Sequence, residues 1–163
     1  MKLDNQQRRL IEIGYLCGLM DGEGTFTISK SNKRKNGKHN LHPYFQMSMR
    51  DLPTIDRAAG IIRELGIGCY VYHKGKGATH VLHCGGYKRL SQLLPIVIPY
   101  LVEKKERAEL VLSYVQRRKD LPRNTPYSVH DYQDQRRMAE LNVKPKHRLE
   151  RSEAICSAPN VLG

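Results

Sequence analysis

The sequence predicts a single α+β domain in which two helix–strand–strand units are followed by a third helix and an extra C-terminal helix. Apolar residues recur with helical spacing in some segments and alternate with polar residues in others, and glycine-rich or proline-rich stretches separate the two kinds. With 163 residues the chain is long enough to close a hydrophobic core without a disulfide framework or a structural metal.

The first half of the chain predicts a helix, a hairpin and a second helix. Apolar residues in 4–20 have helical spacing, and Asp4 is available as an N-cap. From Thr25 apolar and polar residues alternate, and the alternation returns after a basic loop in "YFQMSMR", which indicates a long hairpin. In "DLPTIDRAAGIIRELGIG" the spacing is helical again, with Pro53 in the first turn and Gly66 as the C-cap.

The second half repeats the pattern and adds helices. The stretch "CYVYHKGKGATHVLHC" predicts a second hairpin, and two further helices are expected to be broken around Pro95 and Pro99. A last amphipathic helix is expected over 129–141. We therefore predict one domain over 1–142 and a basic tail over 143–163 that is extended or disordered.

The charge of the chain favours a polyanionic partner. It has 28 Lys and Arg against 16 Asp and Glu, a formal net charge of +12, which makes nucleic acid the leading partner, although charge alone leaves an inert basic surface equally open. No stretch approaches the roughly 18 continuous apolar residues of a membrane span, and the N-terminus lacks the apolar region of a signal peptide. We expect a soluble intracellular protein without a membrane partner, in a compartment that the sequence does not determine.

Cysteine and histidine spacing argues against a zinc site. The four cysteines form no C-x-x-C pair, and three of them lie in apolar or strand-like surroundings, where a free thiol packs as a small hydrophobe. The seven histidines show no H-x-x-H spacing. We interpret His73, His80 and His83 as strand residues.

Glycines recur at every fourth position of the first helix. Gly14, Gly18 and Gly22 share one helical face, and each interior glycine costs about 0.5–1 kcal/mol relative to alanine. A bare face lets another helix approach closely, and the same helix of a second subunit is one such partner. The alternative is a bulky neighbour within the monomer, with Gly22 acting only as a C-cap, and the residues leave both interpretations open.

Two carboxylates follow the glycines. Asp21 and Glu23 fall where the helix is expected to end, which is the unfavourable end of the helix dipole for an anion. A divalent cation would compensate, because hard cations bind carboxylate oxygens and exposed carbonyls. The alternative is a pair of solvated acids at the start of a loop.

These residues carry a resemblance to a known family. The segment "LCGLMDGEG", residues 16–24, resembles the LAGLIDADG motif of homing endonucleases. It is identical at Leu16, Gly18, Leu19, Asp21 and Gly24, and its other positions are conservative changes. The resemblance covers about residues 8–142 and implies the αββαββα LAGLIDADG fold, with an antiparallel sheet that binds DNA.

The resemblance also implies a homodimer and a metal. In single-motif members the motif helices of two subunits pack together at a twofold axis, and the second acid binds Mg²⁺. Carried over, the metal candidates are Glu23, the carbonyl of Gly22, and Asp21, whose role is the more structural one. The interface candidates are Gly14, Cys17, Gly18 and Asp21.

A polar, basic pocket around the metal is a further family feature. Lys104, in "IPYLVEKKER", matches the family's basic residue, and Gln46 and Arg50 are the pocket candidates on the second strand. The catalytic candidates are therefore Glu23, Lys104, Arg50 and Gln46, and the implied chemistry is metal-assisted phosphodiester hydrolysis.

The polar faces of the hairpins are the candidate DNA-reading surface, because a two-stranded ribbon fits the major groove. The strand residues expected to face DNA are Thr25, Thr27, Ser29, Ser31, Gln46, Ser48, Tyr70, Tyr72, Lys74, Thr79, Val81 and His83. The first loop adds Lys33, Arg34, Lys35 and Lys38. The alternative for each residue alone is a solvated sheet face or a solvated charge.

The sequence thus predicts a site-specific homing endonuclease that acts in intron homing. Such an enzyme binds a long pseudopalindromic double-stranded DNA site as a homodimer and hydrolyses both strands with Mg²⁺ or another divalent metal. The alternative is a cleavage-deficient member of the same fold that serves as an RNA-splicing maturase or as a DNA-binding regulator.

Overall fold

The computed structural model describes residues 4–31, 39–75, 79–122 and 124–143. Within these ranges no helix is long and apolar enough to span a membrane. The elements, in chain order, are α1 (Asn5–Glu23), β1 (Gly24–Lys30), β2 (Leu41–Met49), α2 (Leu52–Glu64), β3 (Tyr70–Lys74), β4 (Thr79–Gly85), α3 (Tyr87–Val97), a 3-10 turn (Ile98–Tyr100), α4 (Lys105–Arg118) and α5 (Val129–Leu141). This order confirms the predicted α+β fold.

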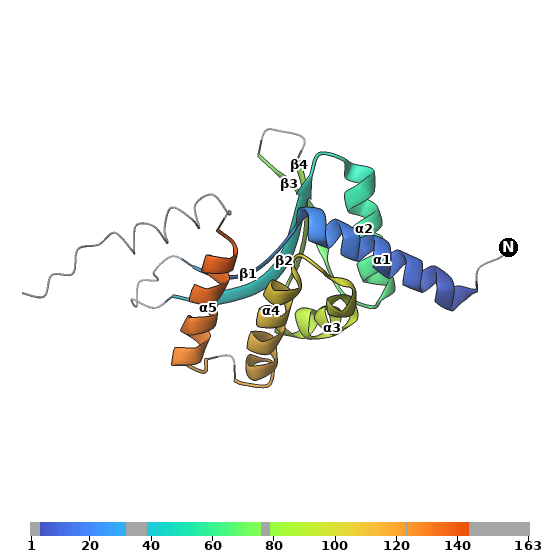
Figure 1. The fold of residues 1–163 in the computed structure, drawn as a ribbon. Coiled ribbons are helices and arrows are strands. Elements are labelled where there is room, and N and C mark those ends of the chain that lie inside the picture. Colours follow the sequence, from blue (N-terminus) through green and yellow to red (C-terminus); the bar gives the residue numbers. More distant parts are fainter. Residues whose placement is uncertain (1–3, 32–38, 76–78, 123, 144–163) are drawn as a thin grey trace, which may run out of the picture.

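The four strands form one antiparallel sheet in the order β1-β2-β4-β3. Both predicted hairpins are present, and the two central strands join them, with Gln46 opposite His83. The helices pack on one face of the curved sheet, and α1 projects beyond the rest of the fold (Figure 1). The described helices leave the other face open.

Alternation along the strands separates a core face from the open face. Phe26 and Phe45 are fully buried beneath the helices, with ring centroids 5.1 Å apart. Met47 and Leu82 extend the same layer. The side chains expected to face the helices do so, which fixes the register because a slip of one residue would reverse every side chain.

Helix boundaries differ from the prediction in two places. Helix α1 continues to Glu23, so both acids lie in its last turn. Pro95 does not break its helix: it lies inside α3, which ends two residues later at Val97. A proline this close to the C-terminal end removes only one late backbone hydrogen bond, whereas Pro99 lies in the 3-10 turn that does end the helical run.

Helix α5 covers the edge of the sheet next to β1 (Figure 1). Its residues 129–141 agree with the prediction. Asp131 accepts a hydrogen bond from the buried guanidinium of Arg118 at 2.8 Å, and this arginine also lies 4.4 Å from the ring centre of Tyr127. The loop before α5 is thereby held against α4. The predicted tail lies outside the described residues from 144 onward.

Candidate active site and nucleic-acid interface

The C-terminal end of α1 passes directly into β1 without a loop. Gly24 makes this junction possible, because a Cβ there would lie 2.5 Å from the carbonyl oxygen of Met20 and 2.7 Å from the ring of Phe45. The last turn of α1 is therefore pressed against β2. The two acids project from this turn, at the edge of the sheet.

Asp21 anchors the segment that precedes α4. Its two carboxylate oxygens accept hydrogen bonds from the backbone N–H of Val102, at 2.8 Å, and of Lys104, at 3.0 Å. Asp21 stays a predicted metal ligand, and each of its oxygens already accepts one backbone donor, which leaves one acceptor site on each. A charge-assisted bond of this kind is a strong one, and Asp21 acts here as a structural residue.

Lys104 brings a positive charge to the negative end of α1. Its ammonium donates to the carbonyl oxygens of Met20 and Gly22, both at 3.2 Å. Burial lowers the pKa of Lys104, while the nearby carboxylates of Glu103, Asp21 and Glu23 partly oppose that shift. Lys104 therefore compensates the helix end, a task that the sequence alone had assigned to a metal.

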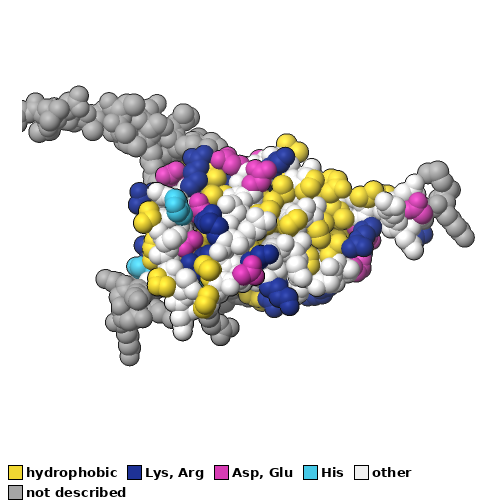
Figure 2. Space-filling view, turned by 90° about the horizontal axis from the view of Figure 1, so that it is seen from below, with side chains coloured by type: hydrophobic (Ala, Val, Ile, Leu, Met, Phe, Trp, Pro, Cys, Tyr) yellow, Lys and Arg dark blue, Asp and Glu magenta, His cyan; other side chains and the backbone are white. Residues whose placement is uncertain are grey.

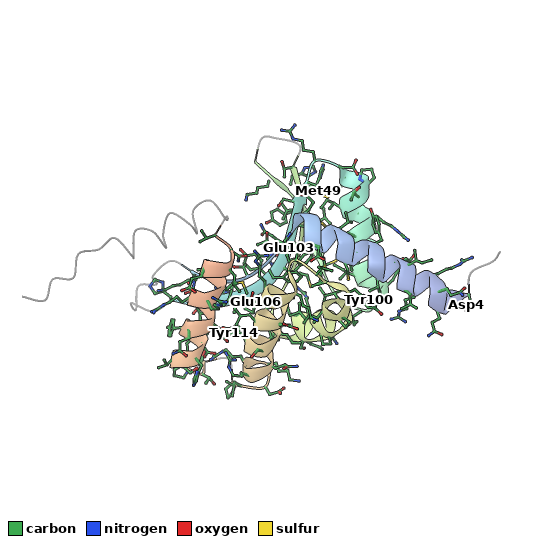
Figure 3. The ribbon with its side chains drawn as sticks, viewed as in Figure 1. Asp4, Met49, Tyr100, Glu103, Glu106 and Tyr114 are labelled. Atoms are coloured by element: carbon green, nitrogen blue, oxygen red, sulfur yellow. The ribbon has the colours of Figure 1, made fainter. Side chains whose placement is uncertain are left out.

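Glu23 is the acid that remains open. Its side chain is exposed, and within the described ranges it takes part in no hydrogen bond or ion pair. Glu103, one residue before Lys104, lies beside the same end of α1 (Figure 3). No group of three or more acidic, histidine or cysteine side chains in the described part of this single chain could hold a metal. The Glu23 carboxylate and the Gly22 carbonyl are the oxygen donors that the helix end offers.

Gln46 and Arg50, the two residues expected to line the metal pocket, lie at different places on β2. Gln46 lies opposite Thr25 in the register, on the open face and partly buried. Arg50 follows the end of β2 and is exposed. Met49, labelled in Figure 3, is partly buried and packs against the hydrophobic core, so its side chain belongs to the helix-covered face. The register places Met47 opposite Gly24, so Gln46 and Ser48 are the open-face residues of β2 that flank the end of α1.

One face of α1 is uncovered. A Cβ added at Gly14, Gly18 or Gly22 would meet no atom of another described segment within 4 Å, so the described part of the subunit places no bulky neighbour at these positions. Ile11 and Tyr15 lie on the same side of the helix and are 57% and 44% exposed. We call these five residues the bare stripe. Hydrophobic side chains gather on the side of the molecule from which α1 projects (Figure 2).

Cys17 does not belong to this stripe. It is 1% exposed, and its thiol donates to the carbonyl of Val97 at 3.6 Å. Burial, reinforced by Asp21, raises the pKa of Cys17 to about 12. The expectation that Cys17 lies at a dimer interface is therefore wrong. The residue is one position before Gly18 and points into the core of its own subunit.

The open face of the sheet carries most of the expected DNA-facing side chains. Thr25, Tyr70, Tyr72 and Lys74 are exposed. The hydroxyl of Ser31 accepts the backbone N–H of Asn40 at 2.8 Å, which closes the base of the first hairpin. Side chains that are partly buried on this face are Thr27, Ser29, Gln46, Ser48, Thr79 and His83. Lys33, Arg34, Lys35 and Lys38 lie outside the described residues.

Val81 is the exception on this face. Its register places it between Ser48 of β2 and Tyr72 of β3, as expected, but it is fully buried. It lies on the interior strand β4, between β2 and β3. The expectation that Val81 contacts DNA is therefore wrong in this structure.

The model of the LAGLIDADG endonuclease family matches residues 16–119. The chain belongs to this family. A search of curated proteins finds no match.

Solved LAGLIDADG structures share the fold. I-CvuI, in complex with its DNA target and Ca, is 16% identical with a TM-score of 0.64, over 93% of this chain and 99% of that one. The archaeal intron-encoded I-Vdi141I, complexed with DNA, is 16% identical with a TM-score of 0.63, over 91% and 98%. I-GzeII, also bound to its DNA target, is 17% identical with a TM-score of 0.60, over 93% of this chain but 53% of that one.

The open face of this LAGLIDADG protein carries two further side chains that are not among those expected to face DNA. His42 and Tyr44 lie on the open face because the alternation of β2 continues back from Gln46. The alternation in "YFQMSMR" already indicates this face for Tyr44, although the expected DNA-facing residues of this strand began at Gln46. Tyr44 and His83 have ring centroids 4.9 Å apart, and His83 and Tyr70 are also 4.9 Å apart.

Proposed function

We propose that this chain is a site-specific, divalent-metal-dependent endonuclease that acts as a homodimer and cuts both strands of a DNA duplex. The observation that carries the proposal is the state of Glu23. It is an exposed carboxylate without a partner in the described structure, next to Lys104 and at the edge of the open sheet face. An acid left unpaired at the negative end of a helix is suited to hold a cation.

The donors fit Mg²⁺. This ion commonly binds through one or two carboxylates together with phosphate oxygens, and it keeps several waters. Glu23 would supply the carboxylate, and the Gly22 carbonyl is adjacent, although it already accepts a bond from Lys104. When bound, the metal supplies Lewis-acid stabilisation of a scissile phosphate. Structures of the related I-CvuI with DNA were solved in the presence of Mg, where the DNA was not cleaved, or of Ca.

The residues around the helix end position that acid. Asp21 fixes the segment before α4, and this segment brings Lys104 onto the α1 carbonyls. A partly desolvated ammonium beside Glu23 is placed to stabilise negative charge on a bound phosphate. Gln46, on the open face near Thr25, is placed to hydrogen-bond a water or a phosphate oxygen.

The bare stripe supports the homodimer. The three glycines allow two α1 helices to approach closely, and Ile11 and Tyr15 would be buried by that contact. A twofold axis along α1 would bring one Glu23 from each subunit toward one duplex. The match covers 99% of the I-CvuI chain but only 53% of the I-GzeII chain. Two copies of this chain would therefore correspond in length to one chain of I-GzeII.

The open sheet face would then read the DNA. A net charge of +12 attracts the duplex, and the polar side chains of the two hairpins lie within one surface that fits the major groove. Two subunits would read a pseudopalindromic site, because each presents the same face to one half.

Cleavage of a plasmid library with randomised inserts tests this function. The expected result is recovery of a narrow set of related sites cut on both strands in Mg²⁺, with no cutting in EDTA. Retained sequence-specific binding without cutting in Mg²⁺ would contradict the enzyme and favour a cleavage-deficient binding protein. Cutting that persists in EDTA would contradict the metal requirement.

A further inference from the structure

Aromatic rings form a continuous row across the open face of the sheet. Tyr44 of β2, His83 of β4, and Tyr70 and Tyr72 of β3 follow one another, with centroid distances of 4.9, 4.9 and 5.9 Å. The planes of successive rings are tilted by 32–33°. Tyr70 is 48% exposed and Tyr72 is 39% exposed, so these rings are accessible. None of the four belongs to the buried core.

The row continues into a groove beside the sheet. A cavity of about 1110 Å³ is lined by Tyr44, Tyr70 and His83 on the sheet and by Tyr127 and Tyr132 near α5. Arg89, at the start of α3, also lines this cavity and lies close enough to His83 to help lower the pKa of its imidazole, after the larger effect of burial. We call this cavity and the row of rings the aromatic groove.

A row of aromatic rings on this face gains less from a duplex than from unpaired bases. In a duplex the base faces are stacked against each other, and only base edges are accessible in the grooves. Flat aromatic side chains therefore gain most from bases that are unstacked, as on sheets and grooves that bind single strands. Arg89 and Lys74, beside these rings, supply positive charge for the backbone of such a strand.

We propose that the aromatic groove binds single-stranded nucleic acid by stacking unpaired bases on Tyr44, Tyr70 and Tyr72. The aromatic groove lies on the same open face that the proposed endonuclease would use to bind DNA. Single-strand binding there requires neither a metal nor cleavage. The ligand chemistry, an unpaired base on a polyanionic strand, is common to RNA and to single-stranded DNA, and the test separates these two sources.

A matched pair of variants tests the stacking. Tyr70→Phe with Tyr72→Phe keeps both rings and removes both hydroxyls, whereas Tyr70→Leu with Tyr72→Leu removes the rings. Both positions are on edge strand β3 and are exposed, so the sheet should tolerate the changes. Binding of labelled oligo(dT), oligo(rU) and a duplex, each of about 12 units, is measured by anisotropy in EDTA. Circular dichroism checks the fold of each variant.

The expected result is that the Phe pair binds single strands as the wild type does and that the Leu pair binds them about tenfold more weakly or worse. Duplex binding should also weaken in the Leu pair, because Tyr70 and Tyr72 belong to the expected DNA-facing surface, but by a smaller factor, since a duplex offers them only base edges. A tighter complex with oligo(rU) would identify RNA as the source, and a tighter complex with oligo(dT) would identify single-stranded DNA.

Three results would overturn the proposal. They are the absence of single-strand binding by the wild type, equal weakening in the Phe and Leu pairs, and equal weakening of single strands and duplex. The wild type also supports a test without variants: 2-aminopurine within the single strand should change its fluorescence on binding if its base stacks, and an unchanged signal would contradict stacking. All of these binding measurements are made without metal. A negative result would therefore leave the cleavage proposal intact, and failure to detect cleavage would leave the single-strand proposal intact.

Discussion

The carboxylate of Asp21 accepts a hydrogen bond from the backbone N–H of Lys104 at 3.0 Å, although 83 residues separate the two in the chain. The side chain of Lys104 returns to the same helix end and donates to the carbonyls of Met20 and Gly22. These reciprocal contacts join the start of α4 to the end of α1. They leave Glu23, two residues after Asp21, as the unpaired acid of this helix end.

Asp21→Asn should destabilise the protein. The carboxylate has two acceptor oxygens, whereas the amide has only one. The NH₂ group of asparagine would therefore face the backbone N–H of either Val102 or Lys104, and that donor would lose its acceptor. We expect a loss of about 1.5–3 kcal/mol in the free energy of unfolding, the range for hydrogen bonds to charged groups, measured by urea titration. Asp120→Asn is the control, because that side chain is 85% exposed and has only a 3.9 Å ion pair with Lys119. Equal stabilities of the two variants would show that the Asp21 carboxylate does not anchor the segment.

Gly18→Leu should separate the subunits without harming the monomer. Apart from its own helix, no described part of the chain lies within 4 Å of a Cβ at this position, and leucine is a better helix former than glycine. At a close helix–helix contact, however, the added side chain overpacks the interface by about 1–3 kcal/mol, so the dimer dissociation constant should rise about tenfold or more. Sedimentation equilibrium measures it.

Ala139→Leu, on an exposed position of α5, is the matched control for this change. It adds a similar apolar side chain to a helix that the proposed dimer does not use. If Gly18→Leu and Ala139→Leu have the same dimer dissociation constant, the bare stripe is not the dimer interface.

His83 should make stability depend on pH. Burial, with a smaller contribution from Arg89, lowers the pKa of its imidazole below the usual 6.5. Below pH 6.5 the unfolded chain therefore binds a proton at this residue more readily than the folded chain, and the free energy of unfolding falls as the solution is acidified toward the folded pKa. The drop in Tm between pH 7.5 and 5.5 should be larger for the wild type than for His83→Gln. Equal drops would argue that the folded protein does not disfavour protonation of His83.

The fold could be predicted because its signals are local. The change from helical to period-two spacing located both hairpins, and amphipathic spacing located α5, whose N-cap Ser128 accepts the N–H of Asp131. The glycines of α1 were interpretable for the same reason, since spacing by four residues defines one helical face.

Contacts between distant segments could not be predicted from such patterns. Nothing near Lys104 in the sequence shows that its ammonium reaches Met20 and Gly22, and nothing near Cys17 shows that its thiol meets Val97. Val81 alternates correctly but is buried, whereas Thr79 and His83 on the same face of β4 are only partly buried, and alternation alone does not distinguish these positions. The family resemblance named Lys104, and only the structure shows how it is held.

Strand cleavage by mixed dimers tests the role of Glu23 most directly. On a supercoiled plasmid that carries a selected site, with Mg²⁺, the wild type should give linear DNA. Glu23→Gln should cut slower by at least about 10²-fold, the scale on which removal of one charge-stabilising group lowers rates, yet bind the site as before. Dimers of one wild-type and one Glu23→Gln subunit should nick a single strand. Linear DNA formed by Glu23→Gln at the wild-type rate would contradict the account.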